Sequence, residues 1–196
     1  MDLETIQIET CITPEILRSE AQDVTFPLSN ELKELVQSMK LKVEKLQGVG
    51  LAAPQVSYPV KIIVYSITPD AAFFRSNAFE TVSPTILINP SYVPTKDAII
   101  ANDWEGCFSV KETAGKVPRY NKIRYTAYNE NGQKIESIAE GFTARVLQHE
   151  IDHINGILIT DRLTKDCIQG KPEAMTKLRL QSLNQEQQLL FKSKLK

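Results

Sequence analysis

The chain has 196 residues, of which 42% are hydrophobic and 24% are charged, and its formal net charge is −1. This length suits one domain with a substantial core, and the near-neutral balance gives no reason to expect nucleic acid as the main partner. No apolar run approaches the roughly 18 residues that cross a bilayer, and the acidic N-terminus lacks a secretion signal. With only Cys11, Cys107 and Cys167, we expect no disulfide framework and a reducing, cytoplasmic compartment.

The first quarter of the chain predicts one helix after an irregular start. Residues 1–27 are expected to be extended or rich in loops. From Leu28 to Leu46 the apolar residues recur at helical spacing, which predicts a helix that packs on a core. Ser29 or Asn30 is the expected cap and Gly48 the expected stop. The glycine-rich stretch 48–55 is too small for a packed element.

Strands dominate the middle of the chain. Runs that are typical of strands lie at 60–67, 85–89, 122–128 and 133–139. The last two are joined across an Asn131-Gly132 step, which indicates a hairpin. The stretch 97–120 is expected to be irregular. We interpret the phenylalanine-rich stretch 68–83 as a covered loop, in preference to a surface insertion near a functional site.

A helix is predicted over 141–155, with Gly156 as its C-terminal stop. One stripe of this helix is apolar and should face the core, whereas the opposite stripe should line a site. The residues from Pro172 onward also have helical periodicity. The sequence therefore predicts a single α+β domain over 1–196, with small antiparallel or mixed sheets around a central helix and a C-terminal helical tail at 168–196.

Both histidines of the chain lie in the segment His149-Glu150-Ile151-Asp152-His153. This is an HExxH pattern, and residues i and i+4 of a helix share one face, so both imidazoles can bind one metal ion. Glu150 can reach a water molecule at that metal without being a ligand. The alternative is a solvated helix that carries two incidental histidines.

A hydrolytic metal site of this type usually has a third protein ligand. A third histidine at position 159 is excluded, because Ile159 stands there. Glu173 lies at a suitable distance in the sequence, but its turn-like context favours a helix-capping role. Cys107 remains, since a thiolate is a strong ligand for zinc or ferrous iron, although a lone cysteine is more often an inert buried residue.

Three sequence blocks together resemble the peptide deformylase family. They are GVGLAAPQ at 48–55, EGCFS at 105–109 and QHEIDHING at 148–156, and they correspond to the family motifs GxGLAAPQ, EGCLS and HExDH in the same order. Phe108 replaces the usual leucine, which should change the pocket lining more than the chemistry. The resemblance covers the chain from its N-terminus to about residue 164.

The resemblance implies a metal centre held by Cys107, His149 and His153, and removal of the formyl group from N-terminal formyl-methionine of new polypeptides. Glu150 would carry the proton during hydrolysis. Gln55 and the backbone N–H of Phe108 would donate hydrogen bonds to the developing oxyanion. The metal would be one divalent ion, with Fe²⁺ favoured and Zn²⁺, Ni²⁺ or Co²⁺ as alternatives.

Gly48 and Gly50 are expected to let the backbone approach an extended substrate, which would pair as an added strand; the alternative is that they only end the preceding helix and turn. The candidate residues for the methionine pocket are Val49, Phe142, Arg145 and Val146. Of these, Arg145 is expected to contribute its aliphatic stem and to keep its charge towards water.

Outside the pocket, a Glu105–Arg119 pair is expected to brace the cysteine loop, with an ordinary surface role for each residue as the alternative. The expected partners are N-formylmethionyl peptides on nascent chains. The net basic tail at 168–196 could also contact the ribosome transiently, and no membrane partner is expected. The rival functions are an HExxH endopeptidase of another type, which would not need Cys107, and a catalytically silent peptide binder.

Overall fold

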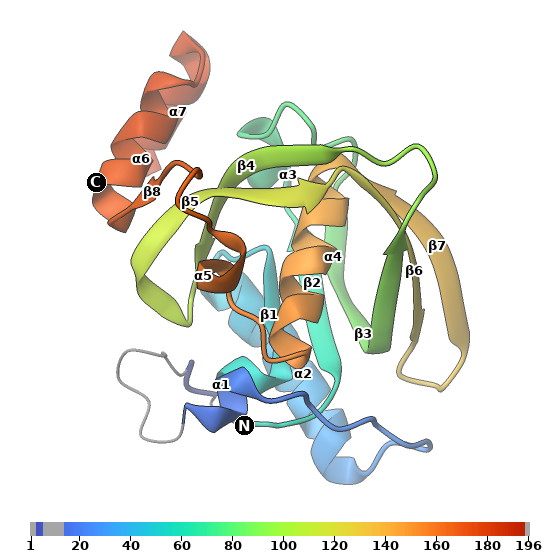
Figure 1. Cartoon of the computed structure of the whole chain (residues 1–196). Helices are drawn as coiled ribbons and strands as arrows, with labels where there is room; N and C mark the ends of the chain where they lie inside the picture. Colours follow the sequence, from blue (N-terminus) through green and yellow to red (C-terminus); the bar gives the residue numbers. More distant parts are fainter. Residues whose placement is uncertain (1–2, 6–13, 195–196) are drawn as a thin grey trace.

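The larger of two antiparallel sheets forms the centre of the fold in the computed structural model, which describes residues 3–5 and 14–194 (Figure 1). Its strand order is β1-β2-β3-β6-β7. The strands are β1 (Gly50–Ala52), β2 (Ile62–Ile67), β3 (Val82–Pro94), β6 (Lys122–Tyr128) and β7 (Lys134–Glu140). All four predicted strands are confirmed, although β3 extends beyond its predicted run at both ends.

β2 is buried along its whole length because helices cover both faces of the sheet. Ile63 and Ile67 pack in the core beneath α4 (Gly141–Ile154), whereas Ile62 and Val64 pack in the core beneath α2 (Asn30–Lys45). A strand with two covered faces reads as a continuous apolar run, and the sequence IIVYSI has this pattern.

The hairpin between β6 and β7 turns at the predicted Asn-Gly step. Gly132 adopts a φ of 76°, in the left-handed region that favours glycine. The side-chain oxygen of Asn129 accepts hydrogen bonds from the N–H groups of Asn131 and Gln133, at 2.9 and 3.0 Å. These bonds hold the turn and therefore fix the register of the two strands.

α2 begins where the sequence predicts, but its end differs. The Ser29 hydroxyl accepts a hydrogen bond from the N–H of Leu32 at 3.2 Å, which confirms Ser29 as the cap. The left-handed residue at the C-terminal end is Gln47, with a φ of 51°, so the prediction that Gly48 stops the helix is wrong by one residue. Glycine at 48 meets a packing requirement, because a Cβ there would lie 2.7 Å from the Phe108 ring.

The stretch 48–55 is also more ordered than its composition predicts. It forms β1 and the short 3-10 helix η1 (Ala53–Val56), and residues 50–56 are all buried. Small side chains favour this arrangement because the segment passes close beneath α4. At Gly50, a Cβ would lie 2.2 Å from Oε1 of Glu150.

The smaller sheet contains β4 (Ile100–Cys107), β5 (Val110–Tyr120) and the short β8 (Gln169–Gly170). The prediction that 97–120 is irregular is therefore wrong. β4 lacks a regular apolar alternation because it buries a charged side chain. The side chain of Glu105 in this strand is buried and accepts a hydrogen bond from Arg145.

α4 lies between the two sheets and begins at Gly141, as predicted (Figure 1). Its apolar stripe is fully buried in the main core and consists of Ala144, Leu147, Ile151 and Ile154. Gly156 follows the helix with a φ of 72°, which confirms its role in the C-terminal stop. The helix therefore holds its polar stripe against the smaller sheet.

The short helices and the tail complete the chain. The described part of the N-terminal segment contains one short helix, α1 (Glu15–Arg18), and α5 (Ile159–Arg162) follows α4. The tail forms two helices instead of the one expected, α6 (Pro172–Gln181) and α7 (Gln185–Lys194). They separate near Asn184, whose side chain accepts a hydrogen bond from the N–H of Gln187 at 2.8 Å.

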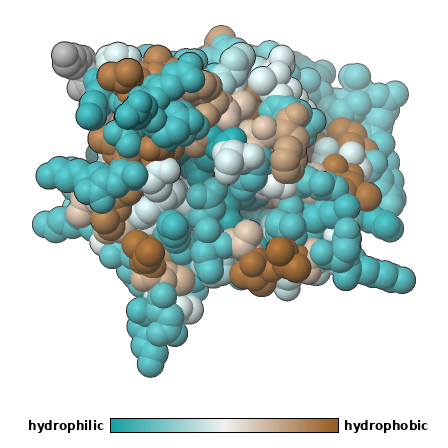
Figure 2. Space-filling model, turned by 90° about the horizontal axis from the view of Figure 1, so that it is seen from above, coloured by the Kyte–Doolittle hydropathy of each residue, from teal (hydrophilic) through white to brown (hydrophobic). Residues whose placement is uncertain are grey.

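The surface carries its apolar residues in separate patches among polar ones, as Figure 2 shows for one face. Phe79 and Leu189 are among the most exposed apolar side chains. Within the described residues, none of the helices combines the length and the apolar character that a membrane span requires.

Candidate metal centre and substrate cavity

A β-hairpin and a helix bring the three predicted metal ligands together. Cys107 ends β4 at the tip of its hairpin with β5, and α4 presents His149 and His153 on one face. Ligand atoms of the three side chains all lie within 4.8 Å of one another. The sulfur of Cys107 is 3.2 Å from Nε2 of His153. The contact between these two elements therefore places a thiol and two imidazoles at one point.

This donor set fits a divalent transition metal. A thiolate and two imidazoles suit zinc or ferrous iron, and three protein ligands leave a position for water. Typical zinc–sulfur and zinc–nitrogen bonds would separate two ligand atoms by about 3.5 Å. The Cys107–His153 distance of 3.2 Å is close to this value. Glu173, the alternative third ligand, is an exposed residue in the first turn of α6 and is not part of the cluster.

Glu105 orients the first histidine. Its Oε2 lies 2.9 Å from Nδ1 of His149, so this ring nitrogen donates and Nε2 is left to face the centre. Arg119 donates two hydrogen bonds to the same carboxylate, each 2.9 Å long. Burial raises the pKa of Glu105, but Arg119 and His149 outweigh it and hold that pKa below its usual range.

The Glu105–Arg119 pair is therefore a buried brace, and the alternative of an ordinary surface role is wrong. Only 2% of the Arg119 side chain and 6% of the Glu105 side chain are exposed. Arg119 also donates to Asp152, which accepts two further hydrogen bonds from Arg162. Sequence reasoning assigned no role to Asp152, although it stands inside the HExxH segment.

Arg145 belongs to the same network, which corrects a prediction. Its charge was expected to face water, but the residue is only 3% exposed. The guanidinium donates to Glu105 at 2.6 Å and to the backbone oxygens of Val117 and Ala101 at 2.7 and 2.6 Å. It is buried because the smaller sheet surrounds it with acceptors, so Arg145 stabilises the ligand loop as well as lining the cavity.

The two imidazoles have different electrostatic environments. Burial lowers the pKa of His153 well below its ordinary value, so this ring is neutral, as a metal ligand must be. For His149, burial also lowers the pKa, but hydrogen bonds to Cys107 and Glu105 outweigh it and raise that pKa. Metal binding at this centre would therefore release a proton.

Glu150 lies beside the centre as a buried carboxylate with one unpartnered oxygen. The residue is 3% exposed, and its Oε2 has no hydrogen-bond partner among the described residues. Burial raises the pKa of Glu150 to about 7. A carboxyl group with such a pKa can both accept and return a proton near neutral pH. Gly50 makes room for this side chain.

Gln55 points its amide nitrogen towards the same point. Its Oε1 accepts a hydrogen bond from the N–H of Ala52 at 2.8 Å, which fixes the orientation of the amide. Nε2 consequently faces the sulfur of Cys107 at 3.7 Å and donates to Oγ of Ser109 at 3.2 Å. Ser109 is fully buried, and sequence reasoning gave it no role although it ends the EGCFS block.

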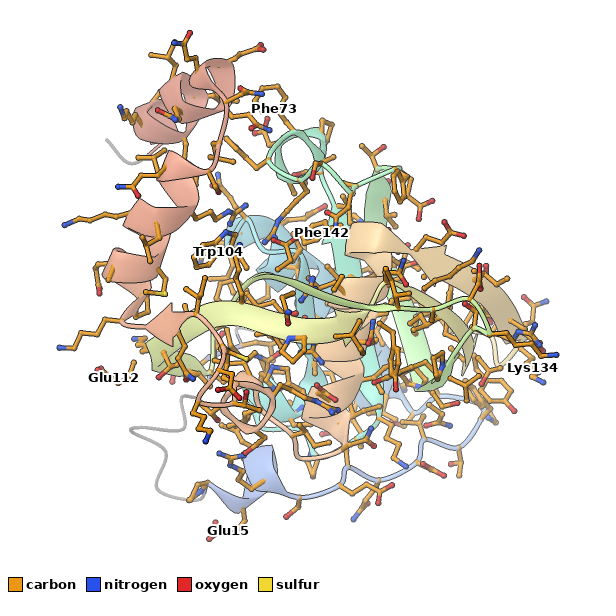
Figure 3. The ribbon with its side chains drawn as sticks, turned by 45° about the horizontal axis from the view of Figure 1, so that its top comes forward. Glu15, Phe73, Trp104, Glu112, Lys134 and Phe142 are labelled. Carbon is orange, nitrogen blue, oxygen red and sulfur yellow. The ribbon has the colours of Figure 1, made fainter. Side chains whose placement is uncertain are left out.

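A cavity of about 800 Å³ opens over the centre. Every predicted site residue except His153 lines it, which includes the candidate pocket residues Gly48, Val49, Gly50, Phe142, Arg145 and Val146. Figure 3 shows Phe142 at the start of α4 and Trp104 on the side that faces the C-terminal helices. Phe142 stacks against the guanidinium of Arg75, which lies 4.5 Å from the ring centre.

The segment 68–83 contributes to the wall of this cavity. It contains α3 (Pro69–Phe73), and Ala71, Phe74 and Arg75 line the cavity. Many of its other residues are exposed, so the interpretation as a covered loop is wrong. The segment reaches the cavity because Arg75 donates to Asp103 and to the backbone oxygen of Trp104, at 2.9 and 2.8 Å.

Comparison with known proteins identifies the family. The sequence pattern described as polypeptide deformylase matches residues 7–168. The chain belongs to the polypeptide deformylase family. Peptide deformylase 2 of Rickettsia conorii is 38% identical over 187 residues, which cover 93% of this chain and 92% of that protein. Peptide deformylase 2 of Ralstonia nicotianae is 41% identical over 133 residues, which cover 68% of this chain and 73% of that protein.

Solved deformylase structures have the same fold. A class I type b peptide deformylase from Acinetobacter baumannii aligns with a TM-score of 0.71 and 29% identity, over 83% of this chain and 99% of that one. The Thermotoga maritima peptide deformylase aligns with a TM-score of 0.68 and 30% identity, over 84% and 99%. These similarities confirm the predicted α+β class.

Membership in the family establishes the activity. The chain is a hydrolase that acts in protein biosynthesis. It removes the N-formyl group from N-formylmethionyl nascent peptides. The predicted deformylase function is thereby confirmed, and neither an endopeptidase of another type nor a silent peptide binder is favoured. The family uses a metal ion, and the described residues offer the Cys107–His149–His153 cluster for it.

Proposed function

We propose that deformylation takes place at the Cys107–His149–His153 centre and that Glu150 carries the proton. One observation supports this assignment above the others. The three ligand atoms lie within 4.8 Å of one another, and the buried carboxylate of Glu150, whose Oε2 has no hydrogen-bond partner among the described residues, lines the same cavity. A divalent ion held by these ligands would supply Lewis acidity and lower the pKa of a water molecule towards neutrality.

We propose Fe²⁺ as the native ion, with Zn²⁺, Ni²⁺ or Co²⁺ as functional substitutes. A thiolate with two imidazoles suits several of these ions. The preference for iron comes from the resemblance to the family and not from the ligands themselves. The buried Glu105 brace supports any of them, because it orients His149 through Nδ1.

The hydrolysis needs two proton transfers, and Glu150 is placed to carry out both. It accepts a proton from the water that attacks the formyl carbon, and it then donates that proton to the amine as the carbon–nitrogen bond breaks. The products are formate and a peptide with a free amino terminus. Gly50 leaves room for this carboxylate, because a Cβ at that position would overlap it.

The formyl oxygen gains negative charge during this reaction and requires hydrogen-bond donors. We assign the Nε2 of Gln55 and the backbone N–H of Phe108 to this role. The bond from Ala52 to Oε1 of Gln55 supports the assignment, because it presents the amide nitrogen to the centre without reorganisation. Ser109 acts on Gln55 as a positioning residue.

The peptide substrate fits along the edge of the larger sheet. β1 is a terminal strand of that sheet, and Gly48, Val49 and Gly50 line the cavity. An extended peptide can therefore pair with this edge, with the methionine side chain directed towards Phe142 and Val146. An Acinetobacter baumannii deformylase is known in a complex bound to Met-Ala-Ser, which has the form of a reaction product.

Replacement of Gln55 by leucine tests the oxyanion assignment. We expect kcat for formate release to fall about 10²-fold, because one donor to the transition state is lost. The metal content should stay unchanged, and KM should change little, since the interaction forms mainly in the transition state. Formate release by the metal-loaded protein measures the effect. Gln181→Leu, an exposed glutamine of α6, is the control. A Gln55→Leu protein with the kcat of the parent would refute the assignment.

Because the substrates are nascent chains, we expect the reaction to take place where polypeptides are synthesised. We propose that the chain acts in the cytoplasm as one catalytic domain over 1–196. The tail carries several exposed lysines, among them Lys171 and Lys177, and these could support transient contact with the ribosome. Ribosome co-sedimentation at low and high salt, with and without charge removal in α6, would test this contact.

A further inference from the structure

The C-terminal helices form the outer wall of the substrate cavity. α6 contributes Pro172, Glu173 and Arg179 to the lining, and α7 contributes Phe191. α7 is attached to the segment around α3, because the Phe191 and Phe74 rings pack edge to face with centres 5.5 Å apart. Residues beyond the family match at 7–168 therefore line the cavity that opens over the metal centre.

Arg179 is the unusual residue in this wall. The buried arginines of the metal centre each bind acidic side chains, but the guanidinium of Arg179 has no hydrogen-bond or ion-pair partner among the described residues. Its side chain is half-buried, and this burial, together with repulsion by Arg75, lowers its pKa to about 10. The nearby Asp103 is engaged by Arg75 at 2.9 Å. Arg179 is thus a charged donor that lacks an acceptor.

The surroundings of Arg179 carry an excess of positive charge. A side cavity of about 210 Å³ lies between α6, β4 and the segment that follows α3. Its ionisable groups are Arg75, Arg179, Lys116 and a single carboxylate, Asp103. Lys116 is placed over the Trp104 ring, 5.2 Å from its centre. Three cations face one acid, so the site is complementary to one or two negative charges.

The side cavity adjoins the main cavity, which brings this charge next to the space for the substrate. Phe74, Arg75, Trp104 and Arg179 line both of them. The acidic residues of the main cavity are elsewhere: Glu105 and Glu150 lie at the centre, and Glu112 and Glu173 line other parts of its wall. In Figure 3, Glu112 lies well away from Trp104. A peptide in the main cavity would meet Arg75 and Arg179 together at this end, whereas Lys111, which also lines the cavity, is next to Glu112 in the sequence.

We propose that Arg179 binds the carboxylate of an acidic side chain in the substrate, downstream of the formyl-methionine, and so favours nascent chains that carry Asp or Glu there. The inference rests on the proposed function of the metal centre. A guanidinium pairs with a carboxylate through two parallel hydrogen bonds, which matches the unsatisfied donors of Arg179. Arg179 is therefore a specificity-determining residue, contributed by the tail.

Matched peptides test the proposal with the full-length, metal-loaded protein. Formyl-Met peptides carry Glu at the second, third or fourth position, and each is paired with a peptide that has Gln there. All are amidated at the C-terminus, so that the side chain is the only carboxylate. We expect one position at which kcat/KM is about five-fold higher for Glu than for Gln, since a partly exposed ion pair contributes at this level. Free acetate should weaken this preference by competition.

Three variants identify the residue responsible. Arg179→Gln should reduce the Glu-to-Gln ratio to about one while leaving the Gln peptide unaffected, because only the charge pair is removed. Lys177→Gln, which removes a charge from an exposed position of the same helix, should leave the ratio unchanged. Arg179→Lys should keep part of the preference.

Three outcomes would overturn the proposal. The first is a parent protein with no preference at any position, and the second is a preference that survives in Arg179→Gln. An equal loss on both peptides would show that Arg179 supports the fold and not the choice of substrate. Failure of the parent protein to release formate from every peptide would refute the proposed function itself, and this result is distinct from the other three.

Discussion

Replacement of Glu150 by glutamine should lower kcat/KM for formate release on the order of 10⁴-fold, at the upper end of what general acid–base catalysis contributes. Glutamine has nearly the same shape but can neither accept nor return the proton. Both transfers of the reaction depend on this one carboxylate, so we expect a larger loss than at Gln55. Metal content should not change, because Glu150 is not one of the three clustered ligands.

The fold of the Glu150→Gln protein should be at least as stable as that of the parent. Oε2 of Glu150 has no hydrogen-bond partner among the described residues, and a buried charged oxygen that lacks such a partner opposes folding. Its thermal midpoint should therefore not fall. Glu173→Gln is the matched control, since Glu173 lines the same cavity but is exposed. Substantial activity in Glu150→Gln, or metal loss in Glu173→Gln, would contradict the assignment of these two carboxylates.

Replacement of Cys107 by alanine should abolish activity by a different route. The site would lose its only thiolate, and two imidazoles alone are a weak site for a divalent ion. We expect metal content after dialysis to fall below about a tenth of that in the parent. Formate release should fall in proportion to the metal that is lost. Elemental analysis on the same samples as the activity assay separates this effect from a loss of catalysis with metal retained.

Cys167→Ala is the control for this experiment. Cys167 is the other free thiol of the described chain, it is partly buried like Cys107, and it is not part of the metal cluster. Its replacement should leave both metal content and activity within about two-fold of the parent, as expected away from functional groups. Full activity in Cys107→Ala would show that the third ligand is a different residue.

The helical period explains why two of the three ligands were predictable from the sequence. A spacing of four residues places His149 and His153 on one helix face in any α-helix, and the apolar stripe identifies which face is buried. Cys107 is different, because it lies in the sequence 42 positions before His149 and meets it only through tertiary packing. Only the resemblance of three motifs to the deformylases indicated that contact.

The smaller sheet was missed because its buried groups are charged. Strand prediction relies on alternating apolar residues, whereas β4 buries Glu105 against Arg119 and Arg145. The same network explains the wrong prediction for Arg145. A lone arginine is expected to reach water with its charge, but Glu105, 40 positions away, provides a buried partner.

The tail shows a third limit of sequence reasoning. Its helical periodicity predicts helix, and two helices are found, but periodicity does not reveal which surface a helix covers. The contacts of Phe191 with Phe74, and of the Gln187 amide with the backbone oxygen of Phe73 at 2.6 Å, determine that α7 lies beside the cavity. Arg179, on the preceding helix α6, lines the same cavity.

The most direct test is formate release from formyl-Met-Ala-Ser by the protein purified without oxygen and loaded with ferrous iron or nickel. We predict equal amounts of formate and Met-Ala-Ser, with activity that disappears on chelation and returns when the metal is restored. Cleavage between Met and Ala, or no formate from a protein that binds its metal, would contradict deformylation at the Cys107–His149–His153 centre.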